Sequence, residues 1–192
     1  MKRFIPFIVA LIFMPNMVKA DNFIFPKKNP FTGTFENQFA FGLGQGFDTG
    51  LLIPPPYKPV PFYIGTFQYS QPTYFFRIPA RRSINISQTL GIGSKNGWDW
   101  EHFTIPIAYL TEEIALFRIQ QTYMGVGAGA GLQAHQNERL GSKLLFTLKI
   151  TLGYNFNEEW AGELFIQHFS NANTADENNS YAFYGIGFTK NF

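Results

Sequence analysis

The chain has 192 residues, of which 45% are hydrophobic, 18% are aromatic and 15% are charged, and it contains no cysteine. Disordered chains are poor in aromatic residues, so this composition indicates a folded domain, and the missing cysteine excludes disulfide scaffolds, cysteine-ligated zinc and thiol nucleophiles. A net charge of +2 without a basic block excludes the electrostatic footprint of a nucleic-acid-binding protein.

The first twenty residues have the pattern of a secretory signal peptide. Lys2 and Arg3 precede an apolar run over residues 4–14, and aliphatic or small side chains precede an expected cleavage site after Ala20. The apolar run is shorter than the ~20 residues that a membrane-spanning helix needs. Cleavage removes three basic side chains and no acidic one, which leaves a net charge of −1. The sequence therefore predicts an exported bacterial protein.

Alternation of apolar with polar or small side chains runs through most of the remaining chain. A period of two places the apolar set of each segment on one face of a β-strand. After a proline-containing lead-in at residues 21–34, we expect eight strands in one domain over residues 35–192. The expected strands cover residues 35–46, 61–70, 83–94, 102–110, 114–131, 143–154, 159–170 and 181–192.

Two of these expected strands have special features. The strand at 102–110 has an apolar face made of Phe103, Ile105, Ile107 and Tyr109. The strand at 114–131 carries glycine at every second position near its end. Glycine inside a strand often marks a bulge or a bend, so we expect one of these irregularities there.

Two architectures fit eight such strands: a soluble sandwich or lipocalin-like barrel that is apolar inside, and an outer-membrane barrel that is apolar outside. An even strand number, spans of about ten residues and abundant aromatic residues favour the membrane barrel. The last strand has an alternating apolar face and ends on Phe192, which resembles the sorting signal of bacterial outer-membrane barrels. Lys190 lies on that face, where its long side chain can reach the membrane interface. We predict an all-β, eight-stranded antiparallel transmembrane β-barrel in the bacterial outer membrane, surrounded by lipid.

The seventh expected strand carries two polar side chains on an otherwise apolar face. His168 and Ser170 share this face with Leu164 and Ile166, and polar groups that face lipid are costly without partners. A neutral histidine can take the proton of a nearby serine and make it a nucleophile. Asn171 follows directly, and its N–H groups can support a developing oxyanion. The alternative interpretation is a strand end where His168 and Ser170 only meet lipid headgroups.

Residues 168–172, His-Phe-Ser-Asn-Ala, resemble the H-x-S-N-A motif of the lipid A 3-O-deacylase (PagL) family. Residues 68–72, Gln-Tyr-Ser-Gln-Pro, and the Ser-Tyr pair at 180–181 are further matches, and the mature chain has the size and strand layout of that family. Family members are outer-membrane esterases that remove the acyl chain ester-linked at position 3 of lipid A. The resemblance implies lipid A, within lipopolysaccharide, as the substrate and no cofactor or metal.

The resemblance also implies roles for individual residues. His168 becomes the general base, Ser170 the nucleophile and Asn171 a contributor to the oxyanion hole. The family orients its histidine with a glutamate just before the Ser-Tyr pair, and Asn179 holds that position here. An amide cannot offset the charge of an imidazolium, and this exchange can cost ~10⁴ in rate in a Ser-His-acid triad.

Glu177, in the same loop as Asn179, is the chemical substitute for the missing carboxylate. The third member of the triad is therefore expected to be Glu177 or Asn179. The substitution at Asn179 also favours a second hypothesis. In this hypothesis the protein is a non-catalytic small outer-membrane barrel that binds or adheres through its extracellular loops.

Two other groups of residues contain side chains that can form binding sites. A small basic cluster between the second and third expected strands is interpreted as a solvated loop or as a contact for lipid A phosphates, since arginine suits phosphate recognition. This cluster consists of Arg77, Arg81 and Arg82. The three histidines are His102, His135 and His168, and they lack the spacing of metal ligands, so we expect no zinc site.

Overall fold

The computed structural model describes residue 31 and residues 37–48, 58–76 and 78–192. These residues form ten strands and one short 3₁₀ helix. The elements are β1 (Gln38–Asp48), β2 (Lys58–Phe75), β3 (Ile78–Gly91), β4 (Ser94–Lys95), β5 (Trp98–Asp99), η1 (Trp100–Phe103), β6 (Pro106–Ile119), β7 (Thr122–Gln133), β8 (Leu144–Asn155), β9 (Trp160–Ser170) and β10 (Tyr181–Asn191). Within the described residues there is no helix with the length and apolar character needed to cross a membrane.

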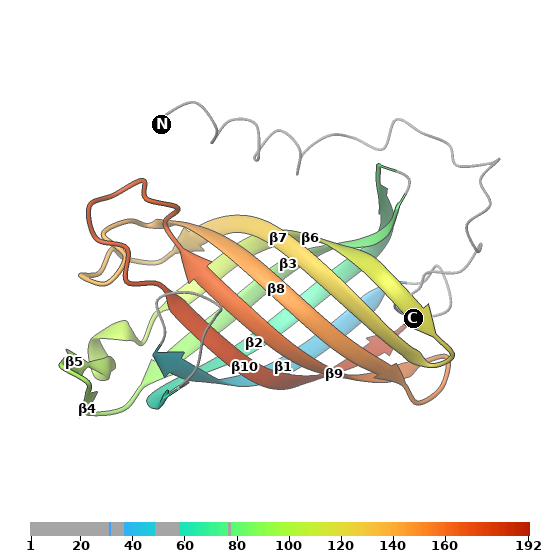
Figure 1. Cartoon of the computed structure of the whole chain (residues 1–192), viewed down its shortest axis with the longest axis horizontal. Coiled ribbons are helices and arrows are strands. Elements are labelled where there is room, and N and C mark those ends of the chain that lie inside the picture. Colours follow the sequence, from blue (N-terminus) through green and yellow to red (C-terminus); the bar gives the residue numbers. More distant parts are fainter. Residues whose placement is uncertain (1–30, 32–36, 49–57, 77) are drawn as a thin grey trace.

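Eight of the strands close into an antiparallel barrel in the order β1-β10-β9-β8-β7-β6-β3-β2 (Figure 1). The ring closes where β1 pairs with β10, from Gln38 opposite Asn191 to Gly46 opposite Phe183. β4 and β5 form a separate small hairpin in the connection between β3 and β6. Closure leaves the wall without a free edge, so its backbone N–H and C=O groups are paired within the sheet, as a lipid environment requires.

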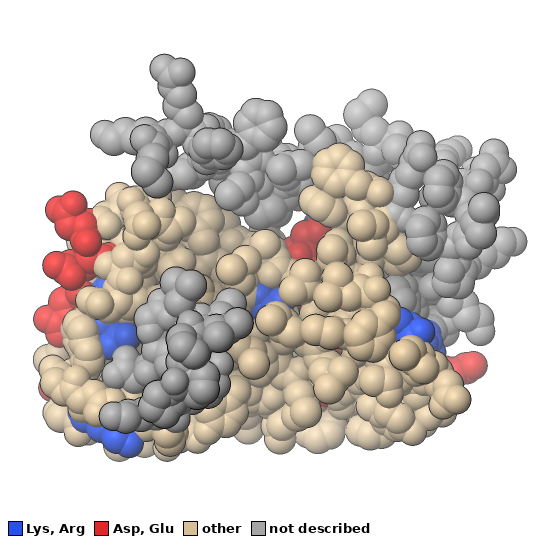
Figure 2. All heavy atoms as spheres, viewed as in Figure 1, with Lys and Arg blue, Asp and Glu red and all other residues tan. Residues whose placement is uncertain are grey.

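The outer face of the wall is apolar and the inner face carries many polar groups. Leu164 on β9 is 57% exposed, whereas its neighbours Glu163 and Phe165 are buried. The same alternation leaves large apolar side chains exposed on other strands, among them Phe39, Leu43, Phe67, Ile84, Ile86, Leu148, Leu152, Ile186 and Phe188. Few charged side chains lie on the part of the wall seen in Figure 2. This distribution is the reverse of that in a soluble barrel and confirms the predicted membrane-barrel architecture.

The last strand presents its apolar side chains outward, as its alternation predicts. Phe188 is exposed on this face, and the ring of the terminal Phe192 stacks on Phe39 of β1 with the centroids 4.8 Å apart. Lys190 is on the same face, and its Nζ lies 5.2 Å from the ring centroid of Trp160 on β9. A cation over an indole ring is favourable at such a distance, which explains how the wall accommodates this lysine.

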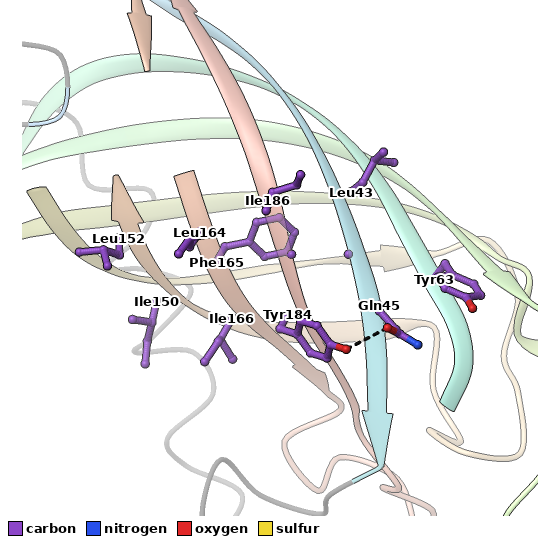
Figure 3. A pocket seen from close by; sticks show the side chains of 12 residues that line it. Leu43, Gln45, Tyr63, Ile150, Leu152, Leu164, Phe165, Ile166, Tyr184 and Ile186 are labelled. Carbon is purple, nitrogen blue, oxygen red and sulfur yellow. Dashed lines mark hydrogen bonds between the residues drawn. The ribbon is translucent and has the colours of Figure 1, made fainter. Parts of the chain in front are cut away.

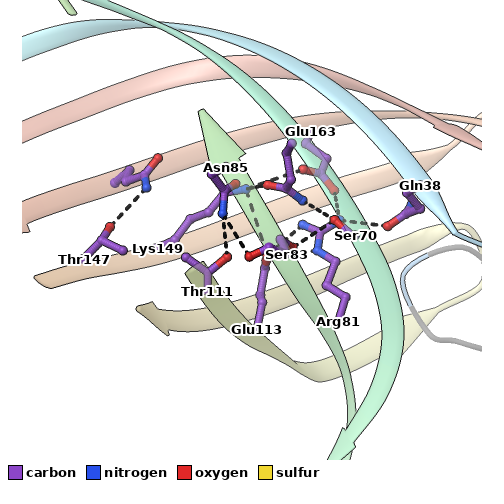
Figure 4. Close-up of polar contacts among 12 residues, drawn as sticks. Gln38, Ser70, Arg81, Ser83, Asn85, Thr111, Glu113, Thr147, Lys149 and Glu163 are labelled. Atoms are coloured by element: carbon purple, nitrogen blue, oxygen red, sulfur yellow. Dashed lines mark hydrogen bonds and ion pairs between the residues drawn. The ribbon is translucent and has the colours of Figure 1, made fainter. Parts of the chain in front are cut away.

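A cluster of charged side chains, the lumen ion cluster, fills part of the barrel interior (Figure 4). The Arg81 guanidinium lies 2.8 Å from Glu113 Oε2 and 2.6 Å from Glu163 Oε1. Lys149 Nζ lies 4.0 Å from both carboxylates, and the Tyr123 hydroxyl donates to Glu163 Oε1 at 2.6 Å. Two cations thus face two anions, which is the condition under which buried charges are tolerated.

An aromatic and aliphatic core fills the lumen beside η1. Its aromatic members include Phe62, Trp100, Phe103, Phe169, Tyr181 and Phe183. Ile107 and Tyr109 of β6 also belong to this core, so the apolar face expected for the strand at 102–110 points into the lumen and not toward lipid. Residues 100–103 form η1 rather than a strand, and this short helix buries Trp100 and Phe103 in the core.

The boundaries expected for the strands at 102–110 and 114–131 are wrong. One strand, β6, continues without a break through residues 111–113, which lie between the two expected strands. The reason is that Glu113 points into the lumen, where Arg81 lies within 2.8 Å of its carboxylate. A buried counter-charge lets an acidic residue remain inside a strand.

The irregularity expected within residues 114–131 is present, but it lies before the glycines and not among them. The register shifts between Ala115 and Phe117 of β6, whereas β7 pairs with β8 without a shift. The glycines of β7 instead allow close packing. A Cβ on Gly129 would lie only 2.0 Å from the carbonyl oxygen of Leu110 on β6.

The connections between strands differ at the two ends of the barrel. Residues 92–105, 134–143 and 171–180 connect strands at one end, which we call the loop end. The opposite end, the turn end, has short turns at residues 120–121 and 156–159. In Figure 1 the loop end is on the left, and the C-terminus lies at the turn end.

The predicted signal peptide at residues 1–20, its cleavage site and most of the lead-in at 21–34 lie outside the described residues. Phe31 from the lead-in is described and is buried in the lumen. Its ring centroid lies 5.5 Å from that of Tyr123 and 4.4 Å from Arg81 Cζ. The lead-in thereby places an aromatic ring against the lumen ion cluster.

Candidate functional site on the outer wall

His168 and Ser170 lie near the loop end of β9 with their side chains on the outer face of the wall. Both are half-buried, whereas Phe169 between them points into the lumen and is fully buried. His168 stands opposite Leu148 on β8 and Ala182 on β10. The alternation of β9 thus places the two residues on the lipid-facing side, as the sequence predicts.

The two side chains share a face but are not hydrogen-bonded. In the described part of the chain, no hydrogen bond joins the His168 imidazole to the Ser170 hydroxyl. Residues i and i+2 of a strand are about 6.6 Å apart at Cα, a separation that two side chains can bridge by rotation. Catalytic hydrogen bonds are often long in unliganded enzymes and shorten when substrate binds. The arrangement is therefore compatible with a serine–histidine pair.

Asn171 is buried and holds the loop that follows β9. Its Nδ2 donates to the carbonyl oxygens of Leu140 and Glu177, the second at 2.6 Å. Its backbone N–H donates to Asn178 Oδ1 at 3.1 Å, and its own Oδ1 accepts from the Asn173 N–H at 2.8 Å. The sequence predicted a donor for an oxyanion, but it did not reveal this structural network, in which both Asn171 donor groups already have protein acceptors.

Glu177 and Asn179 lie in the 171–180 connection with exposed side chains. The Asn179 backbone is held by Arg139, since the Asn179 N–H donates to the Arg139 carbonyl oxygen at 2.6 Å and the Asn179 carbonyl accepts from Arg139 Nε at 2.8 Å. Neither side chain forms a hydrogen bond or an ion pair with His168 within the described residues. The structure brings both candidates to the loop end without putting either in contact with the histidine.

An apolar groove of about 550 Å³ runs along the outer wall (Figure 3). Side chains from five strands line it: Leu43, Gln45, Tyr63, Ile150, Leu152, Leu164, Phe165, Ile166, Tyr184 and Ile186. The backbones of Gly44 and Gly185 complete the lining. A Cβ on Gly185 would lie 2.5 Å from Phe165 Cζ, so the glycine is needed for the ring to pack there.

The groove starts one row of residues away from His168. Ile150, Ile166, Tyr184 and Gln45 are successive cross-strand partners on β8, β9, β10 and β1. His168 belongs to the next row of outward-facing residues on the side of the loop end, two positions along β9 from Ile166. The Tyr184 hydroxyl donates to Gln45 Oε1 at 2.8 Å, which adds one polar pair to the mostly apolar lining.

The basic cluster expected between the second and third strands does not form a solvated loop. Arg81 and Arg82 lie within β3, while Arg77 lies outside the described residues. Arg81 points into the lumen, and Arg82 Nε donates to Glu112 Oε2 at 2.7 Å. Because side chains alternate along β3, the two arginines point to opposite faces of the wall. Each of them forms an ion pair with at least one glutamate.

The histidines do not gather into a metal site. Among the residues that the structure describes, no group of three His, Cys, Asp or Glu side chains is placed to hold a metal ion.

A model of the family described as lipid A 3-O-deacylase (PagL) matches residues 83–191, which is more than half of the chain. The chain belongs to the PagL family. The matched span runs from β3 to β10 and includes His168, Ser170 and the 171–180 connection. The resemblance drawn from residues 168–172 is therefore confirmed at the level of the family. No curated protein matches the chain in a sequence comparison.

Solved structures show the same fold at low sequence identity. The crystal structure of the outer membrane enzyme PagL is 13% identical, with 81% of this chain and 99% of that chain covered and a TM-score of 0.56. The N-terminal β-barrel domain of Pseudomonas aeruginosa OprF is 11% identical, with 82% and 98% covered and a TM-score of 0.54. Neisserial surface protein A is 7% identical, with 81% and 97% covered and a TM-score of 0.58. This PagL-family chain is therefore an outer-membrane-type barrel.

Proposed function

We propose that this barrel is a serine esterase of the outer membrane that removes the ester-linked 3-O-acyl chain of lipid A. The observation that carries the proposal is the position of His168 and Ser170 on the lipid-facing side of the wall, next to an apolar groove. A lipid beside the barrel reaches such a site without entering the lumen. Membrane barrels have their longer connections on the extracellular side, so the loop end faces the leaflet that carries lipopolysaccharide.

The proposed reaction follows from the chemistry of the two side chains. His168 takes the proton of the Ser170 hydroxyl, and the serine oxygen attacks the ester carbonyl carbon. The tetrahedral intermediate collapses, the sugar oxygen leaves with the proton from His168, and the acyl group remains on Ser170. Water, deprotonated by His168, then attacks the acyl-serine ester and releases a 3-hydroxy fatty acid.

Asn171 and one residue of the 171–180 connection complete the proposed machinery. Asn171 supports the oxyanion when substrate binding frees one of its N–H donors from the carbonyl oxygens of Leu140 or Glu177. Glu177 or Asn179 orients the His168 imidazole, and Glu177 has the chemical advantage because a carboxylate also stabilises the imidazolium.

The groove contributes orientation to the proposed reaction. In a bilayer, an acyl chain gains no hydrophobic free energy by moving from lipid tails to an apolar groove. Contacts with Leu164, Ile166 and Ile186 can instead align the chain along the wall. Alignment places the ester carbonyl close to Ser170. The attack then proceeds as an effectively unimolecular step, which lowers its entropic cost.

Mass spectrometry of lipid A from cells that express the chain tests this function. The wild-type protein should remove one 3-hydroxyacyl mass, and Ser170→Ala should leave lipid A intact while the barrel still folds. Ser94→Ala, in the exposed β4–β5 hairpin, serves as the matched control and should behave as the wild type. Deacylation by a folded Ser170→Ala variant would overturn the proposed nucleophile. The intact mass of the purified barrel tests the further proposal that residues 1–20 are cleaved after Ala20.

A second candidate function is a non-catalytic barrel that binds or adheres through its extracellular loops. It is favoured by Asn179 at the position of the family glutamate and by the lack of contact between His168 and either candidate third member in the described residues. Purified, folded wild-type barrel incubated with lipopolysaccharide separates the two functions. Intact lipopolysaccharide would favour the binding function.

A further inference from the structure

The connection between β7 and β8 holds the connection between β9 and β10 through one arginine. Arg139 Nε donates to the Asn179 carbonyl oxygen at 2.8 Å, and Arg139 Nη2 donates to the Ser180 carbonyl oxygen at 3.0 Å. The Arg139 carbonyl oxygen in turn accepts from the Asn179 N–H at 2.6 Å. Three hydrogen bonds therefore fix the last two residues before β10.

The direction of the Arg139 side chain is itself fixed by aromatic rings. Arg139 is 5% exposed, and its Cζ lies 4.6 Å from the ring centroid of Trp98 and 4.9 Å from that of Trp100. A guanidinium held by cation–π contacts and by carbonyl oxygens loses little further freedom when it forms each hydrogen bond. Arg139 thus links the aromatic core of the lumen to the connection that carries both candidate third members.

The residues after Arg139 bind the same connection at one more point and pass close to it at another. The Leu140 carbonyl oxygen accepts from Asn171 Nδ2 at the start of the 171–180 segment. Gly141 has a φ of +57°, and a Cβ there would lie 3.3 Å from both the Cβ and the carbonyl oxygen of Glu177. Residues 139–141, which we call the loop clamp, therefore form hydrogen bonds with the segment at its beginning and at its end, and pass close to it at Glu177.

We propose that Arg139 is a positioning residue for the third member of the triad, a role that rests on the esterase function proposed above. The 171–180 segment has no helix or strand of its own, so the clamp determines where Glu177 and Asn179 lie relative to His168. Arg139 does not touch the reacting atoms in this role. It acts through the residue that orients the imidazole, and an imidazole that is wrongly oriented lowers the rate of the chemical step.

Steady-state kinetics on purified lipopolysaccharide test the role with Arg139→Lys, which keeps the charge but loses the paired donors. We expect kcat to fall by about tenfold or more and KM to change by less than about twofold, because the groove is untouched. Arg118→Lys is the matched control, since Arg118 Nε also donates to a backbone carbonyl, that of Gln120 at the turn end. It should leave both parameters unchanged.

A double-mutant cycle separates positioning from a general loss of structure. If Arg139 acts through Glu177, Arg139→Lys should have little further effect in a Glu177→Gln background, and the same holds for Asn179→Ala if Asn179 is the third member. Gly141→Ala strains the clamp without altering Arg139 and should also lower kcat. All rates are normalised to the folded fraction, measured by heat-modifiable mobility in gels.

The outcomes distinguish this role from the proposed function. An active wild type whose kcat is unchanged in both Arg139→Lys and Gly141→Ala overturns the positioning role alone. Full additivity of Arg139→Lys with both background variants also overturns it. A folded wild-type barrel that does not hydrolyse lipopolysaccharide overturns the esterase function and the positioning role together.

Discussion

Arg81 and Glu163 lie 82 positions apart in the chain and form a 2.6 Å ion pair across the lumen, from β3 to β9. Glu163 is five residues before His168 on the same strand. The lumen ion cluster therefore anchors, from inside, the strand that presents the candidate site outside. Both side chains are almost completely buried, so the pair has no access to bulk water and depends on its partners.

Removal of the buried cation should destabilise the barrel. Arg81→Met leaves Glu113 and Glu163 in the lumen with Lys149 as the remaining cation of the lumen ion cluster, so we expect the free energy of unfolding to fall by about 3–5 kcal/mol. Urea unfolding in detergent micelles measures the change. Arg118→Met, at an exposed site at the turn end, is the control and should change stability by less than about 0.5 kcal/mol. Equal unfolding midpoints for the two variants would contradict the proposed anchoring.

A carboxylate at position 179 should increase activity if Asn179 occupies the place of the family glutamate. Asn179→Glu then supplies the charge that stabilises the His168 imidazolium, and we expect kcat on lipopolysaccharide to rise by about tenfold or more. Glu177→Gln is the matching test for the other candidate. A loss of activity in Glu177→Gln, with no gain in Asn179→Glu, assigns the role to Glu177.

A larger side chain in the groove should impair long acyl substrates selectively. Ile166→Trp fills the row of the groove next to His168, so we expect lipopolysaccharide hydrolysis to fall by about tenfold while hydrolysis of a short-chain ester stays within about twofold. Ile86→Trp places the same ring on the outer face of β3, away from the groove, and is the control. Equal losses on both substrates would show that the groove does not hold the acyl chain.

Loss of the Asn171 amide should loosen the connection after β9. Asn171→Ala leaves the carbonyl oxygens of Leu140 and Glu177 without this donor, at a cost of about 1–3 kcal/mol. We expect faster amide hydrogen exchange over residues 171–180, measured by mass spectrometry. Asn157→Ala is the control, because Asn157 Oδ1 accepts from two N–H groups in the β8–β9 turn. That variant should accelerate exchange at the turn end only.

Local alternation predicted the directions of the β9 side chains better than it predicted the strand boundaries. The outward direction of His168 and Ser170 follows from β9 alone, because side chains of a strand alternate between two faces whatever their neighbours are. Their catalytic roles, and that of Asn171, stay predictions. The boundary near Glu113 was wrong because the sequence does not show that Arg81, on another strand, neutralises this glutamate inside the lumen.

The sequence by itself determined the strand period, the outward face of β9 and the resemblance of residues 168–172 to the PagL family motif. Only the tertiary structure decided what surrounds that motif. The groove exists because closure of the barrel sets β1 beside β10, which brings Gln45 to Tyr184 across 139 positions. The loop clamp exists because the Arg139 side chain packs on aromatic rings of the core and donates hydrogen bonds to the carbonyl oxygens of residues 179 and 180. Alternation is a property of a single strand, whereas strand order, register and loop contacts depend on which distant residues pair, and no local pattern encodes that choice.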